Sequence, residues 1–278
     1  MAIITISREM GSGGIPIVQS AAEELGYTLV DGDTLASVAL QYGLSLEMLA
    51  AVDEKPLAFL DKVDKNLEVA QRQVALIILE YALAGNIIIY GRGGQDLLAG
   101  VDNVFRVRIT APFEERVERW AEREWLDPEL ARILVRRSDQ QRAGFIKYYF
   151  DRDWTDPLSY DLIINTSRLT EETAIKLICD GVNDRNLLEM KDSAKKILRD
   201  KILTKRAEIK LLSSGLLHGL HYYHFHIDVV DGVVALGGHV HSNQQRAEAH
   251  KILRSIEGIK EIIDHLEIRA YESTPQES

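Results

Sequence analysis

Short apolar runs alternate with longer helical patterns over most of the chain. Ile87–Ile89 is uniformly apolar, as is typical of a strand buried on both faces, whereas Phe113, Val117 and Trp120 recur at helical spacing. Strands that alternate with helices predict an α/β fold in which helices flank a mostly parallel sheet. Ligands of such sheets bind beyond the carboxyl ends of the strands. The predicted strands are residues 2–6, 27–30, 86–90, 104–109 and 160–165.

A different pattern follows near the C-terminus. Two alternating runs flank Asp231-Gly232, and this dipeptide is the strongest short signal for a two-residue β-hairpin. Ser242 with Gln245 three residues later predicts a capping box at the start of a helix, and residues 259–268 predict a final strand. This part of the chain is therefore expected to be a small α+β module.

The distribution of histidine supports a division into two parts. All eight histidines lie between His218 and His265, so the two parts differ in composition as well as in pattern. We predict a first domain over residues 1–190, a second over 191–272 and a disordered tail over 273–278.

Charge and cysteine content exclude several classes of protein. The 278 residues include 33 basic and 43 acidic side chains, a net charge of -10, which argues against binding of a nucleic-acid polymer. Cys179 is the single cysteine, so an internal disulfide and a thiolate zinc site are both excluded. The sequence has no apolar run of about 18 residues and no signal-peptide pattern. We therefore expect a cytoplasmic protein and no membrane association.

A glycine-rich turn, Gly-Ser-Gly-Gly at residues 11–14, separates the first predicted strand from the first predicted helix. Backbone N–H groups at a helix N-terminus suit phosphate. Aligned on Gly13 with the standard P-loop, the chain has Arg8 for the first glycine, Gly14 for the lysine and Ile15 for the hydroxyl residue. From this pattern alone, a phosphate loop and a plain tight connection remain equally open.

Several segments at the strand ends occur in collinear order with a known family over about residues 1–185. They are Ile6-Ser7-Arg8, Leu29-Val30-Asp31, Val52-Asp53-Glu54-Lys55-Pro56, Tyr90-Gly91-Arg92-Gly93, Ala111-Pro112, Asp153-Trp154, Asp156-Pro157 and Tyr160-Asp161-Leu162-Ile163-Ile164-Asn165-Thr166. Together with the glycine-rich turn they resemble the cytidylate-kinase-like family, a divergent branch of the P-loop nucleoside monophosphate kinases. The resemblance implies a P-loop kinase-type parallel sheet, ATP and Mg²⁺ as cofactors, and a nucleotide substrate.

The resemblance also implies roles for single residues. Asp31 matches a position at the monophosphate site, and Arg92 matches an arginine that reaches the acceptor nucleotide, although Gly93 replaces the aspartate that follows it in the family. The residues that would cradle the donor phosphates are Gly11, Ser12, Gly13 and Gly14.

An arginine-rich segment resembles the family's lid. Arg137, Asp139 and Arg142 match its arginine, aspartate, arginine spacing, and several guanidinium groups suit the charge of a moving phosphoryl group. The same residues also suit a solvated helical face in which Asp139 pairs with the arginines.

The turn departs from the standard P-loop in two ways. It lacks the lysine, and Ile15 with Pro16 leaves no hydroxyl in the usual magnesium position, so that Ser12 is the one hydroxyl in the turn. We hypothesise that Arg8, at the strand end beside the turn, supplies the missing positive charge and is catalytic together with Arg137 and Arg142.

Alternation in the hairpin predicts one apolar face and one histidine-bearing face. Residue 226 is expected to face 237, residue 224 to face 239 and residue 222 to face 241. A metal site, a pH-sensitive interface and a plain polar surface all remain open for this face. Its histidines are His224, His226, His239 and His241.

Residues from about 193 to 270 resemble a BON domain. The segments Asp231-Gly232-Val233-Val234-Ala235-Leu236-Gly237-Gly238-His239-Val240, Arg246-Ala247 and Glu257-Gly258-Ile259 carry this resemblance. It implies a docking or regulatory module for a protein partner or a second copy of the chain. Lipid binding is not favoured, since the module has neither a basic cluster nor an exposed apolar helix.

Two functions follow from these observations. The first is ATP-dependent phosphoryl transfer to a nucleoside monophosphate, with CMP as the expected acceptor. The alternative is a catalytically inactive nucleotide sensor that binds phosphate and signals through the BON module. Arg92 and the lid arginines favour the kinase, whereas Gly14, Ile15 and Gly93 favour the sensor.

Overall fold

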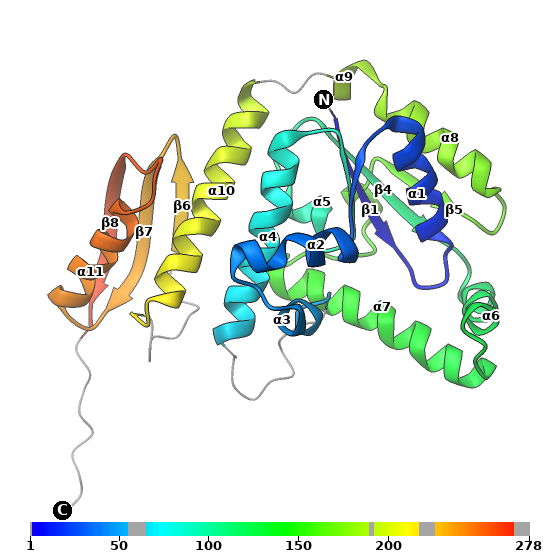
Figure 1. Ribbon diagram of the computed structural model, residues 1–278, viewed down its shortest axis with the longest axis horizontal. Helices are drawn as coiled ribbons and strands as arrows, with labels where there is room; N and C mark the ends of the chain where they lie inside the picture. The colour runs from blue at the N-terminus through cyan, green and yellow to red at the C-terminus, as the bar shows by residue number, and fades with distance from the viewer. Residues whose placement is uncertain (1, 55–64, 189–191, 217–225, 270–278) are drawn as a thin grey trace, which may run out of the picture. The chain divides into compact units, whose positions relative to one another are not determined.

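The computed structural model describes residues 2–54, 65–188, 192–216 and 226–269. The chain forms two compact units, residues 1–198 and 199–278, which are described here one at a time (Figure 1). The predicted boundary at residue 190 and the predicted tail lie outside the described residues.

A five-stranded parallel sheet is the centre of the first unit, as predicted. The strands are β1 (Ile3–Arg8), β2 (Thr28–Val30), β3 (Ile87–Tyr90), β4 (Val104–Thr110) and β5 (Leu162–Asn165). Their order is β2-β3-β1-β4-β5, and every neighbouring pair is parallel. The carboxyl ends of all five strands therefore lie at one edge of the sheet, where ligands of such folds bind.

Helices connect the strands and flank the sheet (Figure 1). They are α1 (Gly14–Leu25), α2 (Gly32–Val38), η1 (Ala39–Tyr42), α3 (Leu46–Ala51), α4 (Lys65–Ala84), α5 (Gly94–Leu97), α6 (Phe113–Glu124), α7 (Pro128–Phe150), η3 (Pro157–Ser159), α8 (Glu171–Val182) and α9 (Arg185–Leu188), and α10 (Asp192–Ser213) leads into the second unit. The arginine-rich segment of the sequence lies in α7, a helix of 23 residues.

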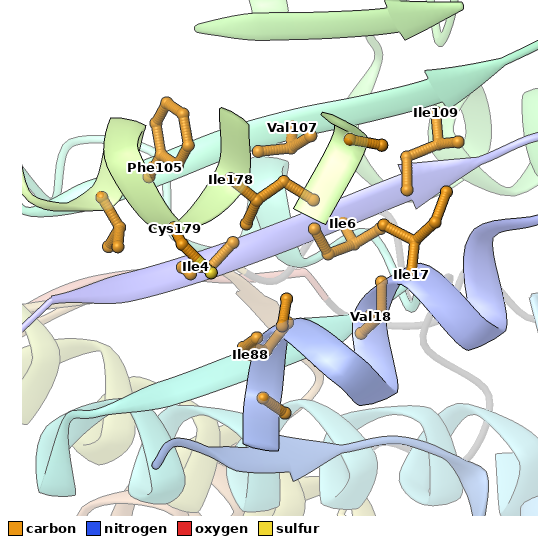
Figure 2. Close-up of a cluster of buried hydrophobic side chains, with 14 of the residues drawn as sticks. Ile4, Ile6, Ile17, Val18, Ile88, Phe105, Val107, Ile109, Ile178 and Cys179 are labelled. Atoms are coloured by element: carbon orange, nitrogen blue, oxygen red, sulfur yellow. The ribbon is translucent and has the colours of Figure 1, made fainter. Parts of the chain in front are cut away.

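One face of the sheet packs against α1 and α8. Ile4 and Ile88 of the strands are buried with Ile17 and Val18 of α1 and Ile178 of α8 (Figure 2). Burial of these aliphatic side chains, at roughly 25 cal/mol per Å² of apolar area, fixes α1 against the sheet. The start of α1, and with it the glycine-rich turn, is thereby held beside the end of β1.

The opposite face of the sheet packs against α4 and α5. A Cβ on Gly94 of α5 would lie 2.9 Å from Ile89 Cγ2 and 3.4 Å from Thr5 Cγ2. Ile89 and Thr5 alternate along their strands with the residues that face α1, so the sheet is covered on both sides.

The second unit is a small mixed sheet, as predicted for the BON module. Its strands are β6 (His226–Val230), β7 (Val233–Val240) and β8 (Glu261–Ile268), in the order β6-β7-β8. The β6–β7 pair is antiparallel around Asp231-Gly232, and His226 pairs with Gly237 as the hairpin pattern predicts. The predicted pairings of residues 222 and 224 lie outside the described residues.

The apolar face of the hairpin packs against two helices. Val229, Val234 and Leu236 are buried in one cluster with Leu211 of α10 and Leu253 of α11 (Asn243–Arg254). This is the apolar face that alternation in the sequence predicts.

The predicted capping box starts α11. Ser242 is the N-cap and its hydroxyl accepts the backbone N–H of Gln245 at 3.2 Å. Gln245 Oε1 reaches back to the backbone N–H of His241 at 2.8 Å, one residue earlier than in the standard box. None of the described helices is both long and apolar enough to cross a membrane.

Candidate active site

The glycine-rich turn joins β1 to α1 at the carboxyl edge of the sheet. Gly13 precedes α1 with a φ of 76°, and no side chain caps this helix. The first backbone N–H groups of a helix have no partner within the helix and favour an anion. A side chain at Gly11 would overlap the carbonyl group of Arg116, so the turn requires glycine there. The turn therefore offers uncapped N–H groups from a closely packed position.

Two cavities adjoin the turn. The turn cavity, of about 280 Å³, is lined by residues 9–16 and by side chains of α6 and α7. The Asp31 cavity, of about 250 Å³, is lined by residues at the ends of β1, β2 and β3. Arg8, Ile15 and Tyr90 line both, so the cavities meet at these side chains.

The two cavities differ in the charge of their linings. Arginines predominate in the turn cavity and carboxylates in the Asp31 cavity. The charged residues of the turn cavity are Arg8, Glu9, Arg119, Arg123 and Arg142, and those of the Asp31 cavity are Arg8, Asp31, Asp33, Asp53 and Arg92.

Three arginines converge on the carboxylate of Glu54, and we call Glu54, Arg8, Arg92 and Arg142 the junction cluster. Arg8 Nη1 donates to both Glu54 oxygens at 2.7 Å. Arg142 Nε donates to Glu54 Oε2 at 3.0 Å, and the backbone N–H of Arg92 donates to Oε1 at 2.6 Å. The guanidinium of Arg8 also lies 4.2 Å from the ring centroid of Tyr90. One buried carboxylate thus joins β1, α7 and the segment after β3.

The charge of Glu54 is stabilised by its partners. Burial by itself raises the pKa of Glu54, but the positive charges of Arg8 and Arg142 and the hydrogen bonds from Arg8 and from the Arg92 N–H lower the pKa to about 2. Glu54 is therefore ionised throughout the neutral range.

The segment after β3 is left-handed at three consecutive residues. Gly91, Arg92 and Gly93 have φ values of 75°, 57° and 66°. Arg92 is held in this strained conformation by its N–H bond to Glu54 and by an ion pair of 3.1 Å from its Nη2 to Asp53. A Cβ on Gly93 would lie 2.6 Å from Phe150 Cε2, so an aspartate does not fit at Gly93 in this packing.

A second group of charges, the turn-base cluster, consists of Glu9, Arg108, Arg116 and Asp139. Arg108 Nη2 lies 3.0 Å from Glu9, and Arg116 lies 3.3 Å from Glu9 and 2.8 Å from Asp139. Burial raises the pKa of Asp139, and Arg116 opposes this change. The cluster ties β4, α6 and α7 to the residues that enter the turn.

The arginines of the turn-base cluster also bond to the backbone. Arg116 donates to the carbonyl oxygens of Ala111 at 2.9 Å and Met10 at 3.1 Å. Arg108 donates to the carbonyl of Trp154 at 2.8 Å and lies 4.3 Å from the centroid of its ring. These hydrogen bonds occupy donors of both guanidinium groups and fix the backbone segments that they contact.

Comparison with known proteins identifies the first unit. Residues 3–168 match the model of the cytidylate kinase-like family. The chain belongs to this family. The cytidylate kinase of Natronomonas pharaonis is 33% identical over 187 residues, which are 65% of this chain and 89% of that protein. The cytidylate kinase of Methanopyrus kandleri is 31% identical over 199 residues, 68% of this chain and 96% of that protein.

A solved structure and a second family model complete the comparison. The crystal structure of an uncharacterized protein from Eubacterium ventriosum matches with a TM-score of 0.54 and 22% identity, over 66% of this chain and 100% of that chain, and it supports the fold alone. Residues 199–270 match the BON domain model.

The site residues predicted from the sequence of this cytidylate kinase-like chain do not form a single group in the structure. Arg8, Arg92 and Arg142 are brought together by Glu54. Asp31 caps α2, where its Oδ1 accepts the backbone N–H of Thr34 at 2.9 Å, and it lines the cavity named after it.

Arg137 and Asp139 lie apart from that group. Arg137 is exposed and lines neither cavity. Asp139 accepts from Arg116 at 2.8 Å and from the backbone N–H of Met10 at 3.4 Å. The carboxylate of Asp139 thus contacts the backbone of Met10, beside the turn, and Asp139 lines neither cavity.

Several residues of the site were missed by sequence reasoning. Glu54 stood inside a segment that carried the family resemblance, but its partners lie 38 to 88 positions away in the sequence. Arg119 and Arg123 of α6 were not among the predicted site residues, yet they line the turn cavity. Their spacing of four residues, which puts both on one helix face, was the available signal.

Mg²⁺, which the family implies, has no protein hydroxyl prepared for it in the turn. Ser12 is fully buried, and its Oγ donates to the carbonyl of Glu9 at 2.8 Å. Ile15 stands where the standard P-loop has a hydroxyl residue. Within the described ranges, no three histidine, cysteine, aspartate or glutamate side chains are grouped to hold a metal ion. The side chains of the turn therefore do not fit a direct magnesium site.

The histidine face of the BON domain is described in part. His226 is exposed and His239 is half-buried, while His241 Nδ1 lies 2.8 Å from the carbonyl oxygen of Arg269. His224 lies outside the described residues. Metal binding by this face stays a prediction.

Proposed function

We propose that this chain transfers the γ-phosphoryl group of ATP to a nucleoside monophosphate, with CMP as the expected acceptor. The observation that carries the proposal is the junction of two cavities at Arg8. The turn cavity, with four arginines and the uncapped start of α1, suits a polyphosphate. The Asp31 cavity lies on the other side of Arg8, and its two arginines, Arg8 and Arg92, would bind the phosphate of the acceptor.

In this proposal Arg8 replaces the absent lysine. It lines both cavities, so its charge is placed where a phosphoryl group would pass from one to the other. Arg142 and Arg92 contribute charge from the two sides, and the N–H groups at Gly13 and Gly14 bind the donor phosphates. Mg²⁺ would neutralise phosphate oxygens, and the turn offers it no side-chain ligand, because Ser12 Oγ donates to the carbonyl of Glu9.

A nucleotide sensor is the second candidate function. The absence of a free hydroxyl in the turn favours it, since Ser12 is bonded to Glu9 and Ile15 is apolar. In either case we propose that the BON domain docks a protein partner or a second copy of the chain.

One pair of measurements separates the two functions. ADP release is followed with ATP, Mg²⁺ and a panel of nucleoside monophosphates, and ATP binding is measured by calorimetry on the same preparation. Turnover that is highest with CMP supports the kinase, whereas binding without turnover on any acceptor supports the sensor. Absence of ATP binding contradicts both.

The role of Arg8 is tested in the same assays. Arg8→Ala is expected to lower turnover by about 100-fold or more, because a charge aimed at the transferred group is lost. If ATP affinity and turnover both stay at the wild-type level, Arg8 does not replace the lysine.

A further inference from the structure

Glu54 accepts hydrogen bonds from three residues that the proposed function assigns to different substrates, namely from the side chains of Arg8 and Arg142 and from the backbone N–H of Arg92. Arg142 lines the turn cavity, Arg92 lines the Asp31 cavity and Arg8 lines both. Glu54 itself lines neither of these two cavities. Its carboxylate contacts the side chains of Arg8 and Arg142 and the backbone of Arg92. The side chain of Glu54 itself is 11% exposed.

The bonds to Glu54 do not use all the N–H donors of the Arg8 and Arg142 guanidinium groups. Arg8 uses Nη1 for Glu54, and its Nη2 makes no hydrogen bond to any described residue. Arg142 uses Nε for Glu54 and Nη1 for Ser138 Oγ at 2.7 Å. Its Nη2 makes no hydrogen bond to any described residue. Each arginine is thus oriented through some donors and keeps another for a ligand.

We propose that Glu54 is a positioning residue that holds Arg8 and Arg142 together at the meeting point of the two cavities, with donors left to bind the transferred phosphoryl group. The inference rests on the proposed function. Arg8 and Arg142 bond to the same oxygen, Oε2, which brings two like charges close together. One negative charge between two positive ones makes this arrangement stable and leaves a net positive charge for phosphate.

The backbone around Glu54 is shaped for this contact. Glu54 has a φ of 45° and Gly91 a φ of 75°. A Cβ on Gly91 would overlap both Arg8 Nη1 and Glu54 Oε1, so glycine at this position lets the pair form. The bond from the Arg92 N–H to Glu54 further couples the acceptor side to the two arginines.

The main test compares Glu54→Gln with Glu54→Asp and with a matched control. Glu114→Gln is the control, because Glu114 also accepts two bonds from an arginine, Arg132, each of 2.6 Å, but is exposed and lines neither cavity. We expect Glu54→Gln to lower kcat by about 100-fold, since misplacement of an aligned group by about 1 Å costs this much. The KM for the acceptor should change by less than about threefold, whereas the KM for ATP should rise by about tenfold, because the two arginines meet the terminal phosphate of ATP.

Glu54→Asp keeps the charge on a shorter side chain. It should recover about a tenth of the wild-type kcat, whereas Glu114→Gln should match wild type. If Glu54→Gln does not fold, Gly91→Ala provides the second variant, because its methyl group would separate Arg8 from Glu54 without removing a charge. A kcat of Glu54→Gln within threefold of wild type, or an equal loss in Glu114→Gln, would overturn the proposal.

A binding measurement separates this inference from the proposed function. The ratio of ADP to ATP dissociation constants reports on the terminal phosphate, and calorimetry measures it without turnover. Glu54→Gln is expected to reduce this ratio by about tenfold, since the two arginines would no longer meet that phosphate. An unchanged ratio overturns the inference even if the chain is a kinase, and a reduced ratio supports it even if no acceptor is phosphorylated. If wild type binds neither nucleotide, both are overturned.

Discussion

The junction cluster and the turn-base cluster have the same chemistry but different surroundings. Each places a glutamate, with a side chain that is 11% or 16% exposed, against two guanidinium groups beside the glycine-rich turn. In the turn-base cluster the two arginines are 6% exposed and donate to three backbone carbonyls. In the junction cluster Arg8 and Arg142 are 13% and 17% exposed, line cavities and retain donors. The difference indicates that unused donors, rather than the number of arginines, mark a phosphate site in this chain.

The largest expected effect comes from the turn-base cluster. Arg116→Ala leaves the half-buried carboxylates of Glu9 and Asp139 without this partner and removes a buried guanidinium that bonds to two carbonyls, so the free energy of unfolding should fall by about 3–5 kcal/mol. Urea unfolding followed by circular dichroism measures it.

Arg132→Ala is the control for Arg116→Ala. Its pair with Glu114 is exposed, so the loss should stay below about 1 kcal/mol. Equal losses in the two variants would mean that the turn-base cluster does not hold the turn in place.

A smaller effect, on activity rather than on stability, is expected in the junction cluster. Arg142→Ala should lower turnover by about 100-fold, or about 2.7 kcal/mol of transition-state stabilisation. Its free energy of unfolding should fall by less than that of Arg116→Ala, because Glu54 keeps Arg8 as a partner. Steady-state kinetics and urea unfolding of the same variant check both parts.

Arg137→Ala tests the same distinction, between an arginine that lines a cavity and one that does not. Arg137 lines neither cavity, so we expect a loss of turnover of less than about threefold. A loss as large as that of Arg142→Ala would instead support the lid role implied by the family resemblance, and would contradict the distinction by unused donors.

The fold was predictable because its signals are local. The apolar run Ile87–Ile89 predicts β3, Asp231-Gly232 predicts the hairpin, and Ser242 with Gln245 predicts the start of α11; each lies within a few residues of the element that it specifies. Alternation in the hairpin also predicts which face is buried, because side chains of a strand alternate with a period of two.

The site was predictable only where the turn itself defines it. The contacts of Glu54 with Arg8 and Arg142 join residues 46 and 88 positions apart, and no local pattern specifies such pairs. The lid role of Arg137 stays a prediction, and Arg137 and Arg142 lie in different places for a geometric reason. Residues five positions apart on an α-helix differ by about 140° in direction, so Arg137 and Arg142 of α7 do not face the same cavity. Ser138, four positions before Arg142, does share its face and bonds to it.

An effect on stability alone is expected at Ser12, which the sequence assigns to nucleotide binding. Its Oγ donates to the carbonyl of Glu9 at 2.8 Å and its own carbonyl accepts from Thr166 Oγ1 at 2.9 Å, so Ser12 contributes to the base of the turn. Ser12→Ala should lower the free energy of unfolding by about 1 kcal/mol, the net value of one hydrogen bond, and leave the Mg²⁺ dependence of turnover unchanged. Ser37→Ala is the matched control, because Ser37 makes a similar bond to a carbonyl, that of Thr34, at 2.7 Å but at the surface; its loss should not exceed about 0.5 kcal/mol. A tenfold rise in the Mg²⁺ concentration for half-maximal turnover in Ser12→Ala would instead mean that this hydroxyl binds the metal. The glycine-rich turn would then have to move during the reaction, because Ser12 Oγ must first leave the carbonyl of Glu9.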